Sequence, residues 1–338
     1  MNKLVSVNIV TYNAQDLIEK CLKSVLNQTY KNLEILVVDN ASTDKTKKII
    51  QNSKFKIQNF RFIENSINLG YTGGHNIGIR ESKGEYVLCL TQDVVLDKNF
   101  VEYAVEAMEE DDKIAAIQGK LFRKNDVLDS TGLVMFKNRR VIDRGSGEID
   151  KGQYDGPSSP SGRELSAREI FGANGAAPLY RREALKDIKI DNEYFDEDLF
   201  MYKEDIDLAW RLQLYGWKAI YQPKALAYHL RSAGEKAIKD YLSVALARRK
   251  ISKFAKFYSF KNDRLIRIKN ELPGLFFRHI FYIIIKEIGA WAYVLFFEHY
   301  TWKAIRELIK QIPNTWRKRK LIMARKRANN KELARWFI

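Results

Sequence analysis

The sequence predicts an α/β fold, with a mainly parallel sheet, helices on both of its faces, and a basic helical region after it. Three observations lead to this prediction. Short apolar runs alternate with segments of helical periodicity through the first 230 residues, which is typical of strand–helix–strand units. Several apolar runs end in polar residues, and such sheets bind ligands beyond the carboxyl ends of their strands. From about residue 237 the pattern becomes helical and rich in Lys and Arg.

The expected elements follow one another regularly. Strand-like runs cover residues 4–10, 33–39, 60–64 and 86–91, and helical spacing covers residues 14–27, 43–52 and 74–82. Residues 145–164 are rich in Gly, Ser and Pro, which predicts a loop, and the sequence leaves open whether it is a lid or a passive insertion. We expect one unit over residues 1–235, divided near residue 95, and a helical unit over residues 236–338.

The net charge of +16 is unevenly distributed along the 338 residues. Residues 231–338 hold 26 Lys and Arg against 8 Asp and Glu, whereas residues 1–230 are nearly neutral. This asymmetry indicates an anionic partner, either a lipid surface or a nucleic acid. Because long apolar runs interrupt the basic region and no nucleic-acid recognition motif is found, we expect a lipid surface and no nucleic acid.

Two further features concern the compartment. Cys21 and Cys89 lie in apolar segments without metal-ligand spacing, which indicates buried thiols in a reducing environment. The first residues lead into a strand without an apolar signal region, so we expect a cytoplasmic protein.

Residues 275–297 are rich in apolar and aromatic residues, but we do not expect a simple membrane span. Arg278, Lys286 and Glu287 interrupt the segment, and a spanning helix needs about 20 mostly apolar residues. The pattern favours a helix lying in a membrane interface, with the basic runs 316–320 and 325–327 near anionic headgroups. The alternative is an ordinary helical subdomain packed on the rest of the protein. We therefore expect peripheral attachment to the inner face of the cell membrane.

Three acids, Glu204, Asp205 and Asp207, open a short amphipathic helix that ends near Gly216. Acids at a helix start also stabilise the helix through its dipole, so this cluster alone does not indicate a site. Asp93, after an apolar strand, and the lone His229 strengthen the functional interpretation. Carboxylates at strand and helix ends, together with one His, are what a metal–diphosphate enzyme needs.

Other polar residues follow the predicted strands. Asp39 could accept a hydrogen bond from a nucleoside or could cap the following helix, and both alternatives stay open. The glycine-rich segment 68–78 matches neither a Walker loop nor a dinucleotide fingerprint, but its free amides could hold a diphosphate. The alternative is a turn without a ligand. Gln92-Asp93 offers one carboxylate for a divalent cation, and His229 could be a further ligand or a structural residue.

Together these segments resemble glycosyltransferase family 2, and in particular its bacterial rhamnosyltransferase-like members. Members of this family have the GT-A fold, which contains a Rossmann-like mixed sheet. The matching segments occur in family order within residues 5–230: Val10–Asn13, Val38–Asp44, Asn68–Gly78, Gln92-Asp93, Gly172–Ala176 with Arg181-Arg182, and Glu204–Asp207. The family's DXD motif lacks its first acid here, because the stretch reads Thr91-Gln92-Asp93. This departure points to the rhamnosyltransferase-like members, which tolerate Gln or Pro before the Asp. It also puts the affinity of the site for a metal in question.

The resemblance implies roles for these residues. Asp205 would be the catalytic base with Glu204 beside it, and Asp93 and His229 would bind a divalent Mg²⁺ or Mn²⁺. The acceptor side would be formed by Gly172, Ala173, Asn174 and Arg181. The donor site would be lined by Thr11, Tyr12, Asn13, Asp39, Asn68, Gly70, Gly73, Gly74, Asn76 and Gln92.

The implied reaction is an inverting transfer of a sugar from a nucleotide-sugar donor, with dTDP-rhamnose favoured and UDP-hexoses next. The acceptor would be a polysaccharide or a polyprenyl-diphosphate-linked saccharide of cell-surface polysaccharide synthesis, and a homodimer is compatible with the sequence. Two alternatives remain. One is a catalytically weak scaffold, suggested by the degenerate Gln92-Asp93 pair. The other is a processive synthase, which would need several spans and a Gln-x-x-Arg-Trp motif that Glu332–Trp336 only approximates.

Overall fold

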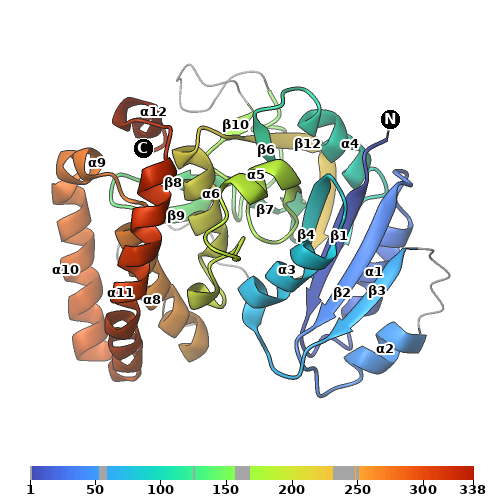
Figure 1. Cartoon of the computed structure of the whole chain (residues 1–338), viewed down its shortest axis with the longest axis horizontal. Helices are drawn as coiled ribbons and strands as arrows, with labels where there is room; N and C mark the ends of the chain where they lie inside the picture. The colour runs from blue at the N-terminus through green and yellow to red at the C-terminus, as the bar shows by residue number, and fades with distance from the viewer. Residues whose placement is uncertain (1, 53–58, 125, 157–167, 231–247, 249–250) are drawn as a thin grey trace.

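The computed structural model describes residues 2–52, 59–124, 126–156, 168–230, 248 and 251–338. A ten-stranded sheet with its flanking helices forms one side of the molecule, and the C-terminal helices stand together on the other side (Figure 1). The sheet order is β10-β12-β6-β11-β4-β1-β2-β3, with β5 added to β12 and β7 added to β6.

The first half of the sheet is parallel, as the sequence predicts. It consists of β1 (Val5–Thr11), β2 (Leu33–Asp39), β3 (Phe60–Glu64) and β4 (Tyr86–Thr91). The register pairs Thr11 with Asp39 and Val10 with Thr91. The carboxyl ends of β1, β2 and β4 therefore lie side by side at one edge of the sheet.

The second half makes the sheet mixed. β6 (Ile114–Phe122) and β12 (Lys218–His229) are parallel to each other, but β11 (Leu179–Arg181) lies antiparallel between β4 and β6. The other antiparallel additions are β5 (Val94–Leu96), β7 (Leu128–Ser130) and β10 (Glu169–Ile170), and β8 (Leu133–Met135) and β9 (Val141–Asp143) form a separate pair. Because β11 is antiparallel to both β4 and β6, β6 and β12 run in the same direction as β4, and the expectation of a mainly parallel sheet is confirmed. The antiparallel strands have only two or three residues, which carry too little periodicity to be seen in the sequence.

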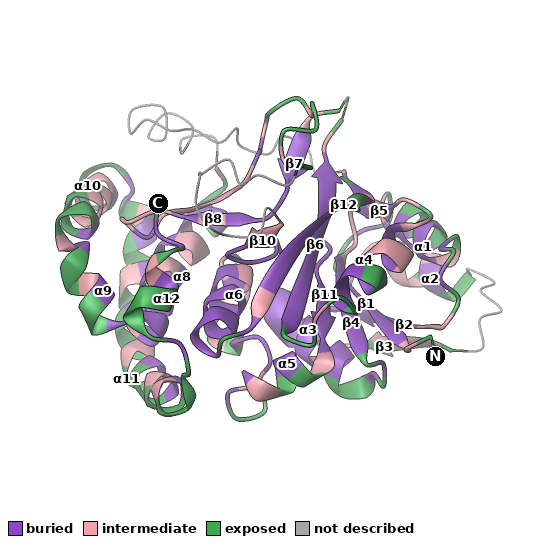
Figure 2. Ribbon diagram, turned by 90° about the horizontal axis from the view of Figure 1, so that it is seen from above, coloured by how far each residue is buried: buried purple, intermediate pink, exposed green. Residues whose placement is uncertain are grey.

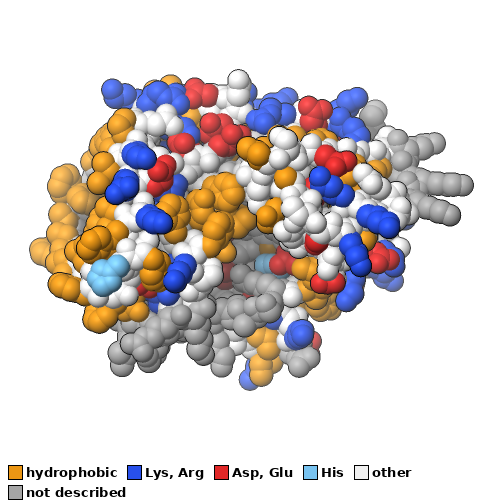
Figure 3. All heavy atoms as spheres, turned by 90° about the horizontal axis from the view of Figure 1, so that it is seen from below, with side chains coloured by type: hydrophobic (Ala, Val, Ile, Leu, Met, Phe, Trp, Pro, Cys, Tyr) orange, Lys and Arg blue, Asp and Glu red, His pale blue; other side chains and the backbone are white. Residues whose placement is uncertain are grey.

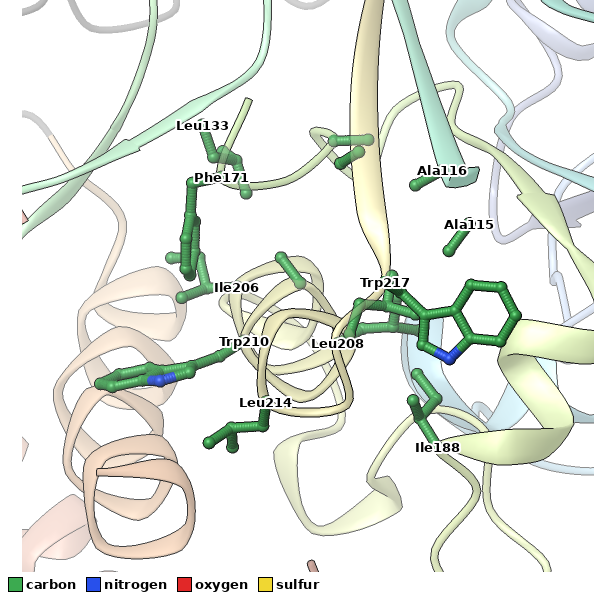
Figure 4. Close-up of a cluster of buried hydrophobic side chains, with 14 of the residues drawn as sticks. Ala115, Ala116, Leu133, Phe171, Ile188, Ile206, Leu208, Trp210, Leu214 and Trp217 are labelled. Carbon is green, nitrogen blue, oxygen red and sulfur yellow. The ribbon is translucent and has the colours of Figure 1, made fainter. Parts of the chain in front are cut away.

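The sheet has a hydrophobic core on each face because successive strand residues point to opposite sides. In β1, Val5, Val7 and Ile9 pack under α1 (Ile18–Leu26), α2 (Thr46–Asn52) and α4 (Phe100–Met108). The opposite face packs under α3 (Gly70–Glu81), α5 (Arg182–Asp187) and α6 (Glu204–Leu214). Figure 4 shows part of this second core, where Leu208 and Trp210 extend from α6 in different directions.

The glycine-rich segment is a helix and not a turn, which corrects the expected helix start at residue 74. α3 begins at Gly70, which has φ +68°, and its later glycines lie against β1. A Cβ at Gly74 would come within 2.7 Å of Val10 Cγ1, and one at Gly78 within 3.0 Å of Asn8 Cγ. These glycines therefore permit a close helix–strand contact that larger residues would prevent. The other two expected helices, 14–27 and 43–52, are shorter, at Ile18–Leu26 and Thr46–Asn52.

The C-terminal helices share the second core with the sheet. They are α8 (Lys253–Asn270), α9 (Pro273–Arg278), α10 (Ile280–Phe297), α11 (Trp302–Arg325) and α12 (Asn330–Ala334). Leu265 of α8, Leu308 of α11 and Phe337 after α12 belong to the same cluster as Trp210 of α6. The expected boundary at residues 235/236, the start of the basic region near 237, and residues 157–164 of the expected loop lie outside the described residues.

α10 has one buried and one exposed side. Ile283 and Val294 are buried, whereas Phe281, Phe296 and Phe297 are 79%, 72% and 72% exposed. Figure 2 shows α9 and α10 with long exposed stretches facing away from the molecule. Judged by length and composition alone, α10 could cross a membrane. Sequence reasoning rejected a simple span because Arg278, Lys286 and Glu287 interrupt the segment. Lys286 and Glu287 lie within α10, and both side chains form ion pairs with α8.

Candidate active site

Gln92 joins the carboxyl ends of β1 and β4. Its Oε1 accepts hydrogen bonds from Thr11 Oγ1 at 2.9 Å and from the Tyr12 amide at 2.7 Å, and its Nε2 donates to the Tyr12 carbonyl at 3.2 Å. A carboxylate could accept the first two bonds but could not donate the third. The geometry thus gives Gln92, the middle residue of the Thr91-Gln92-Asp93 stretch, a structural reason to be an amide.

Asp93, the next residue, lies against His229 at the end of β12. The His229 Nε2 is 3.1 Å from Asp93 Oδ2, and its Nδ1 is 2.8 Å from Asp129 Oδ2. Arg123 Nε donates to the other oxygen of Asp129 at 2.7 Å. Burial alone would lower the pKa of His229, but the two carboxylates outweigh it and raise that pKa to about 9. Burial would raise the pKa of Asp93, but His229 outweighs it and lowers that pKa.

This arrangement fits a divalent cation held together with a diphosphate. Among the described residues no group of three or more His, Cys, Asp or Glu is arranged as a complete metal cage. A cation bound to phosphate oxygens and water needs only one or two protein ligands. Asp129 holds His229 Nδ1 as outer carboxylates hold metal-ligating imidazoles, which directs Nε2 towards Asp93. The site could therefore bind a cation through Asp93 and His229, once His229 has lost its Nε2 proton.

The loops after β1 and β2 are locked together by side chains. Asn13, at φ +49°, accepts from the Thr43 amide at 2.9 Å, and its own amide donates to Ser42 Oγ at 2.9 Å. Asp39 is fully buried and accepts from the Ser42 amide at 2.9 Å and from the Ser42 hydroxyl. Its carboxylate therefore caps its own loop, while Tyr12 and Asn13 remain exposed at the same edge.

The α3 residues expected at the donor site mainly position other segments. Asn68 Oδ1 accepts from the Gly70 amide at 2.8 Å and shapes the helix start. Gly73 packs closely against Leu69. Asn76 is buried, and its amide makes four hydrogen bonds, accepting from the Tyr194 and Phe195 amides and donating to the Phe195 carbonyl and Glu197 Oε1.

Glu204 and Asp205 begin α6 and face the loop after β10. Asp205 Oδ2 accepts from the Gly175 amide at 3.2 Å, and Glu204 is buried. A Cβ at Gly175 would lie 3.6 Å from Glu204 Oε1. Burial raises the pKa of both carboxyl groups, and the charge of Asp205 raises that of Glu204 further. A carboxylate with a raised pKa is a stronger base than an exposed one, so this pair suits proton removal.

The segment Gly172–Ala176 connects these acids to the strand that precedes Asp93. Gly172 packs against Ala209 of α6, and Ala173 is buried beside it. The Thr91 amide donates to the Ala176 carbonyl at 3.0 Å. Hydrogen bonds therefore run from Asp205 through Gly175–Ala176 to Thr91, two residues before Asp93. The structure brings the acidic helix start and the Asp93–His229 pair to one side of the sheet.

Arg181 is not part of this group. The register pairs it with Tyr86, at the amino end of β4 and thus at the opposite edge of the sheet. Its guanidinium donates to the carbonyls of Ile114 and Met108, each at 2.7 Å. The interpretation as an acceptor-side residue therefore has no geometric support.

Three residues that sequence reasoning missed take part in the site. Asp129 orients His229, Gln118 Oε1 accepts from the Asn174 amide at 2.6 Å, and the Tyr71 hydroxyl donates to the Gly175 carbonyl at 2.8 Å. A lone acid in an apolar run is a weak signal for Asp129, and the sequence carries none for Gln118. Asn174 also uses its side chain, donating to Asp143 Oδ1 at 2.7 Å and accepting from the Ala176 amide at 2.9 Å.

Comparisons with known proteins place this geometry in a family. The family model for glycosyl transferase family 2 matches residues 6–189. The chain is similar to the poly-β-1,6-N-acetyl-D-glucosamine synthase of Staphylococcus epidermidis, with 29% identity over 232 residues, covering 67% of this chain and 50% of that protein. A synthase of the same name from Staphylococcus aureus is 28% identical over 228 residues, covering 66% and 48%. The chain thus spans about half the length of these curated relatives.

Solved structures show the same fold at low sequence identity. TarS 1–349 of S. aureus in complex with UDP-GlcNAc has a TM-score of 0.57 and 18% identity, covering 96% of this chain and 84% of that one. The mannosyltransferase PcManGT of Pyrobaculum calidifontis in complex with GDP-Man and Mn²⁺ has a TM-score of 0.53 and 18% identity, covering 99% and 78%. Since the family model covers more than half of the chain, the protein belongs to glycosyl transferase family 2 and has the GT-A fold.

Proposed function

We propose that the protein is an inverting glycosyltransferase that moves a sugar from a nucleoside-diphosphate donor to a saccharide hydroxyl. The observation that carries the proposal is the hydrogen-bonded link between two acidic sites. The Glu204–Asp205 pair contacts Gly175, and the adjacent Ala176 is bonded to the strand that precedes Asp93. One site suits proton removal and the other suits a diphosphate with its cation.

In the proposed reaction the acceptor oxygen attacks the anomeric carbon from the face opposite the diphosphate. The new carbon–oxygen bond forms as the bond to the diphosphate oxygen breaks, and that oxygen leaves with the electron pair. Asp205 takes the proton of the acceptor hydroxyl, helped by the raised pKa that burial gives its carboxyl group. Glu204 lies beside it, and its raised pKa favours the protonated form, which leaves Asp205 as the base.

Asp93 and His229 would hold the divalent cation, Mg²⁺ or Mn²⁺, with Asp129 fixing the imidazole. When bound, the cation neutralises charge on the departing diphosphate. The amide of Gln92 keeps the ends of β1 and β4 in register beside the donor. Tyr12 and Asn13, exposed at this edge, are proposed to contact the nucleoside.

The identity of the donor is part of the proposal. The sequence resemblance favoured dTDP-rhamnose, with UDP-hexoses next. The names of the relatives shift this order, because they are N-acetylglucosamine polymer synthases and a TarS structure with UDP-GlcNAc. We therefore propose a UDP-hexosamine or UDP-hexose ahead of dTDP-rhamnose.

The acceptor is proposed to be a lipid-linked saccharide at the inner face of the membrane. Hydrophobic side chains gather over the C-terminal helices, with Lys and Arg among them (Figure 3). An apolar helix face rimmed by basic residues suits an anionic bilayer surface. Such a position would bring the active site close to a polyprenyl-diphosphate-linked acceptor.

A donor panel tests the proposal directly. The purified protein is incubated with UDP-, dTDP- and GDP-sugars, with Mg²⁺, Mn²⁺ or EDTA, and the released nucleoside diphosphate is measured. We expect one donor to be consumed in a metal-dependent way. In the Asp93→Ala variant, we expect the turnover that depends on the metal to be lost. If no donor is turned over, even when a lipid-linked acceptor extract is added, the proposal that the protein is an active enzyme is refuted. The alternative of a catalytically weak scaffold would then be favoured.

A processive synthase is a second candidate, because the curated relatives are polymer synthases by name. The segment Glu332–Trp336, which only approximates the synthase motif, lies beside Phe171, the residue before Gly172–Ala176. Trp336 packs on Phe171 with ring centroids 6.2 Å apart and donates to Gln213 Oε1 at 2.8 Å. Mass spectrometry of the products separates the two functions, since a single transfer gives one added sugar and a synthase gives a ladder.

A further inference from the structure

We infer that Asn262 of α8 is a positioning residue for the catalytic acids, holding the backbone that leads into Glu204 and Asp205. This inference rests on the proposed function. Asn262 lies in the C-terminal helical region, outside residues 6–189 that the family model matches. The C-terminal helices would therefore take part in catalysis as well as in attachment to a surface.

The segment before the acids has an unusual backbone. Phe200, Tyr202 and Lys203 have φ values of +60°, +67° and +73°, although none of them is a glycine. A positive φ is disfavoured for a residue that carries a side chain, and three such residues within four positions persist only when their surroundings impose the conformation. Because Lys203 is directly followed by Glu204, any relaxation of this segment would move both acids.

The carbonyls of this segment are all held from outside it. Asn262 Nδ2 donates to the carbonyls of Leu199, Met201 and Tyr202, at 2.8, 2.9 and 2.7 Å. The remaining carbonyl, that of Phe200, faces α3 and accepts from the Thr72 amide at 3.2 Å. Four successive carbonyls thus lie between α8 and α3. A single side-chain amide holds three of them.

The chemistry of the contact requires a donor. The amide nitrogen of Asn262 faces three acceptors, whereas its Oδ1 has no hydrogen-bond partner among the described residues. Asp has the same shape but would place a carboxylate oxygen against carbonyl oxygens, which repels. Ala would remove the donor that these three carbonyls share, and the Leu199 carbonyl would still accept from the Met201 amide at 2.6 Å.

Other residues of α8 also contact residues 198–207, so the contact of Asn262 is not isolated. Tyr258 stacks on Phe200 with centroids 5.1 Å apart, and Lys261 Nζ donates to the Asp198 carbonyl at 2.6 Å. One turn beyond the acids, Asn270 Nδ2 donates to Asp207 Oδ1 at 2.7 Å. These neighbours keep the segment near its place when one contact is removed, so variants at 262 should fold.

The test compares Asn262→Asp and Asn262→Ala with Ser252→Ala in the full chain. Ser252 caps the same helix, accepting from the Ala255 amide at 3.1 Å, so its variant weakens α8 without touching the segment. Turnover and KM are measured with the donor that the wild-type protein consumes. Hydrogen–deuterium exchange of residues 199–206 is measured without substrate.

We expect both Asn262 variants to lower kcat by about 10²-fold, as a misplacement near 1 Å does, while KM for the donor stays unchanged. Exchange at residues 199–206 should rise in both variants and stay at the wild-type rate in Ser252→Ala. Unchanged kcat in folded variants, or a parallel loss of donor binding, would overturn the inference. If the wild-type protein consumes no donor, the proposed function fails, and unchanged exchange would still overturn the positioning role.

Discussion

The His229 imidazole bridges two carboxylates, and this determines how the site responds to pH and to substitution. With a pKa raised to about 9, His229 is protonated at neutral pH when no metal is bound. A cation must displace the Nε2 proton, so its affinity should increase as the pH rises towards that pKa.

Asp129→Asn tests this arrangement. The change keeps the shape of the side chain but removes the charge that holds His229 Nδ1, so Mn²⁺ affinity should fall by about 10–100-fold. Titration calorimetry in the presence of the nucleoside diphosphate measures the loss. Asp126→Asn, at an exposed position nearby, is the matched control and should bind Mn²⁺ like the wild-type protein. Equal affinities for the two variants would contradict the role of Asp129.

The acids that begin α6 give a second prediction. Asp205→Asn should lower transfer by about 10²–10⁴-fold and leave donor binding intact, because only proton removal is lost. In the wild-type protein, burial raises the pKa values of Asp205 and Glu204, and a base acts only when deprotonated. The acidic limb of the kcat–pH profile should therefore lie above the usual carboxylate range. A limb near pH 4, or a fully active Asp205→Asn variant, would show that another group is the base.

The sequence indicated candidate site residues better than it indicated their contacts. Asp93, His229 and the Glu204–Asp205 pair were singled out because acids and a His at strand and helix ends are a local signal, and their roles stay predictions. Asp39 accepts from the Ser42 amide in its own loop, and Asn76 bonds to Tyr194, Phe195 and Glu197 far along the chain, a contact for which the sequence holds no local signal. Arg181 lies at the other edge because β11 runs antiparallel, a direction that three residues cannot reveal.

Helices α8 and α11 contact the catalytic part through a buried cluster of Lys and Asp side chains. Lys318 of α11 lies 2.5 Å from Asp196 Oδ1 and 3.0 Å from Asp198 Oδ2, and Lys269 of α8 also contacts Asp196. Burial would raise the pKa of Asp196, but the two lysines outweigh it and lower that pKa far below its usual value. The cluster therefore stabilises the folded state at neutral pH, and this contribution is lost only in strong acid.

Lys318→Met should destabilise the protein by about 3–5 kcal/mol, because it leaves buried carboxylates short of a partner. Urea unfolding at pH 7 measures the change. Lys320→Met, at an exposed position of the same helix, should have a free energy of unfolding close to that of the wild-type protein. If both variants unfolded at the same urea concentration, the buried cluster would contribute no net stability.

Elements differ in how well the sequence predicts them. β1, β2 and β4 are apolar runs of six or seven residues and were found, as was the shorter β3, whereas strands such as β10 depend on partners far along the chain. α3 was placed late because its glycines indicate a turn locally, and only the close contact with Val10 explains them. Tertiary packing decided these elements, and a single sequence does not contain it.

The whole molecule combines a nearly neutral catalytic part with a basic helical part. Within the basic part, α10 has an exposed apolar side. Lys286 lies 3.0 Å from Asp263 of α8, and Glu287 lies 2.8 Å from Arg264. These pairs turn both charges of α10 inwards and leave Phe281, Ile285 and other apolar residues exposed. A helix that lies on a bilayer keeps the pairs, whereas a helix that crosses it would have to break them.

The double variant Phe281→Ser with Ile285→Ser should therefore bind anionic vesicles at least about tenfold more weakly, because each buried apolar side chain contributes about 1.5–3 kcal/mol. Vesicle flotation measures binding, and Ile67→Ser, at an exposed position of the catalytic part, is the control. Binding of the wild-type protein should also weaken with added salt, since the flanking Lys and Arg act through screened charge. Alkaline carbonate should release the protein from membranes. Retention after carbonate, with salt-independent binding, would instead mean that α10 inserts across the bilayer and separates from α8.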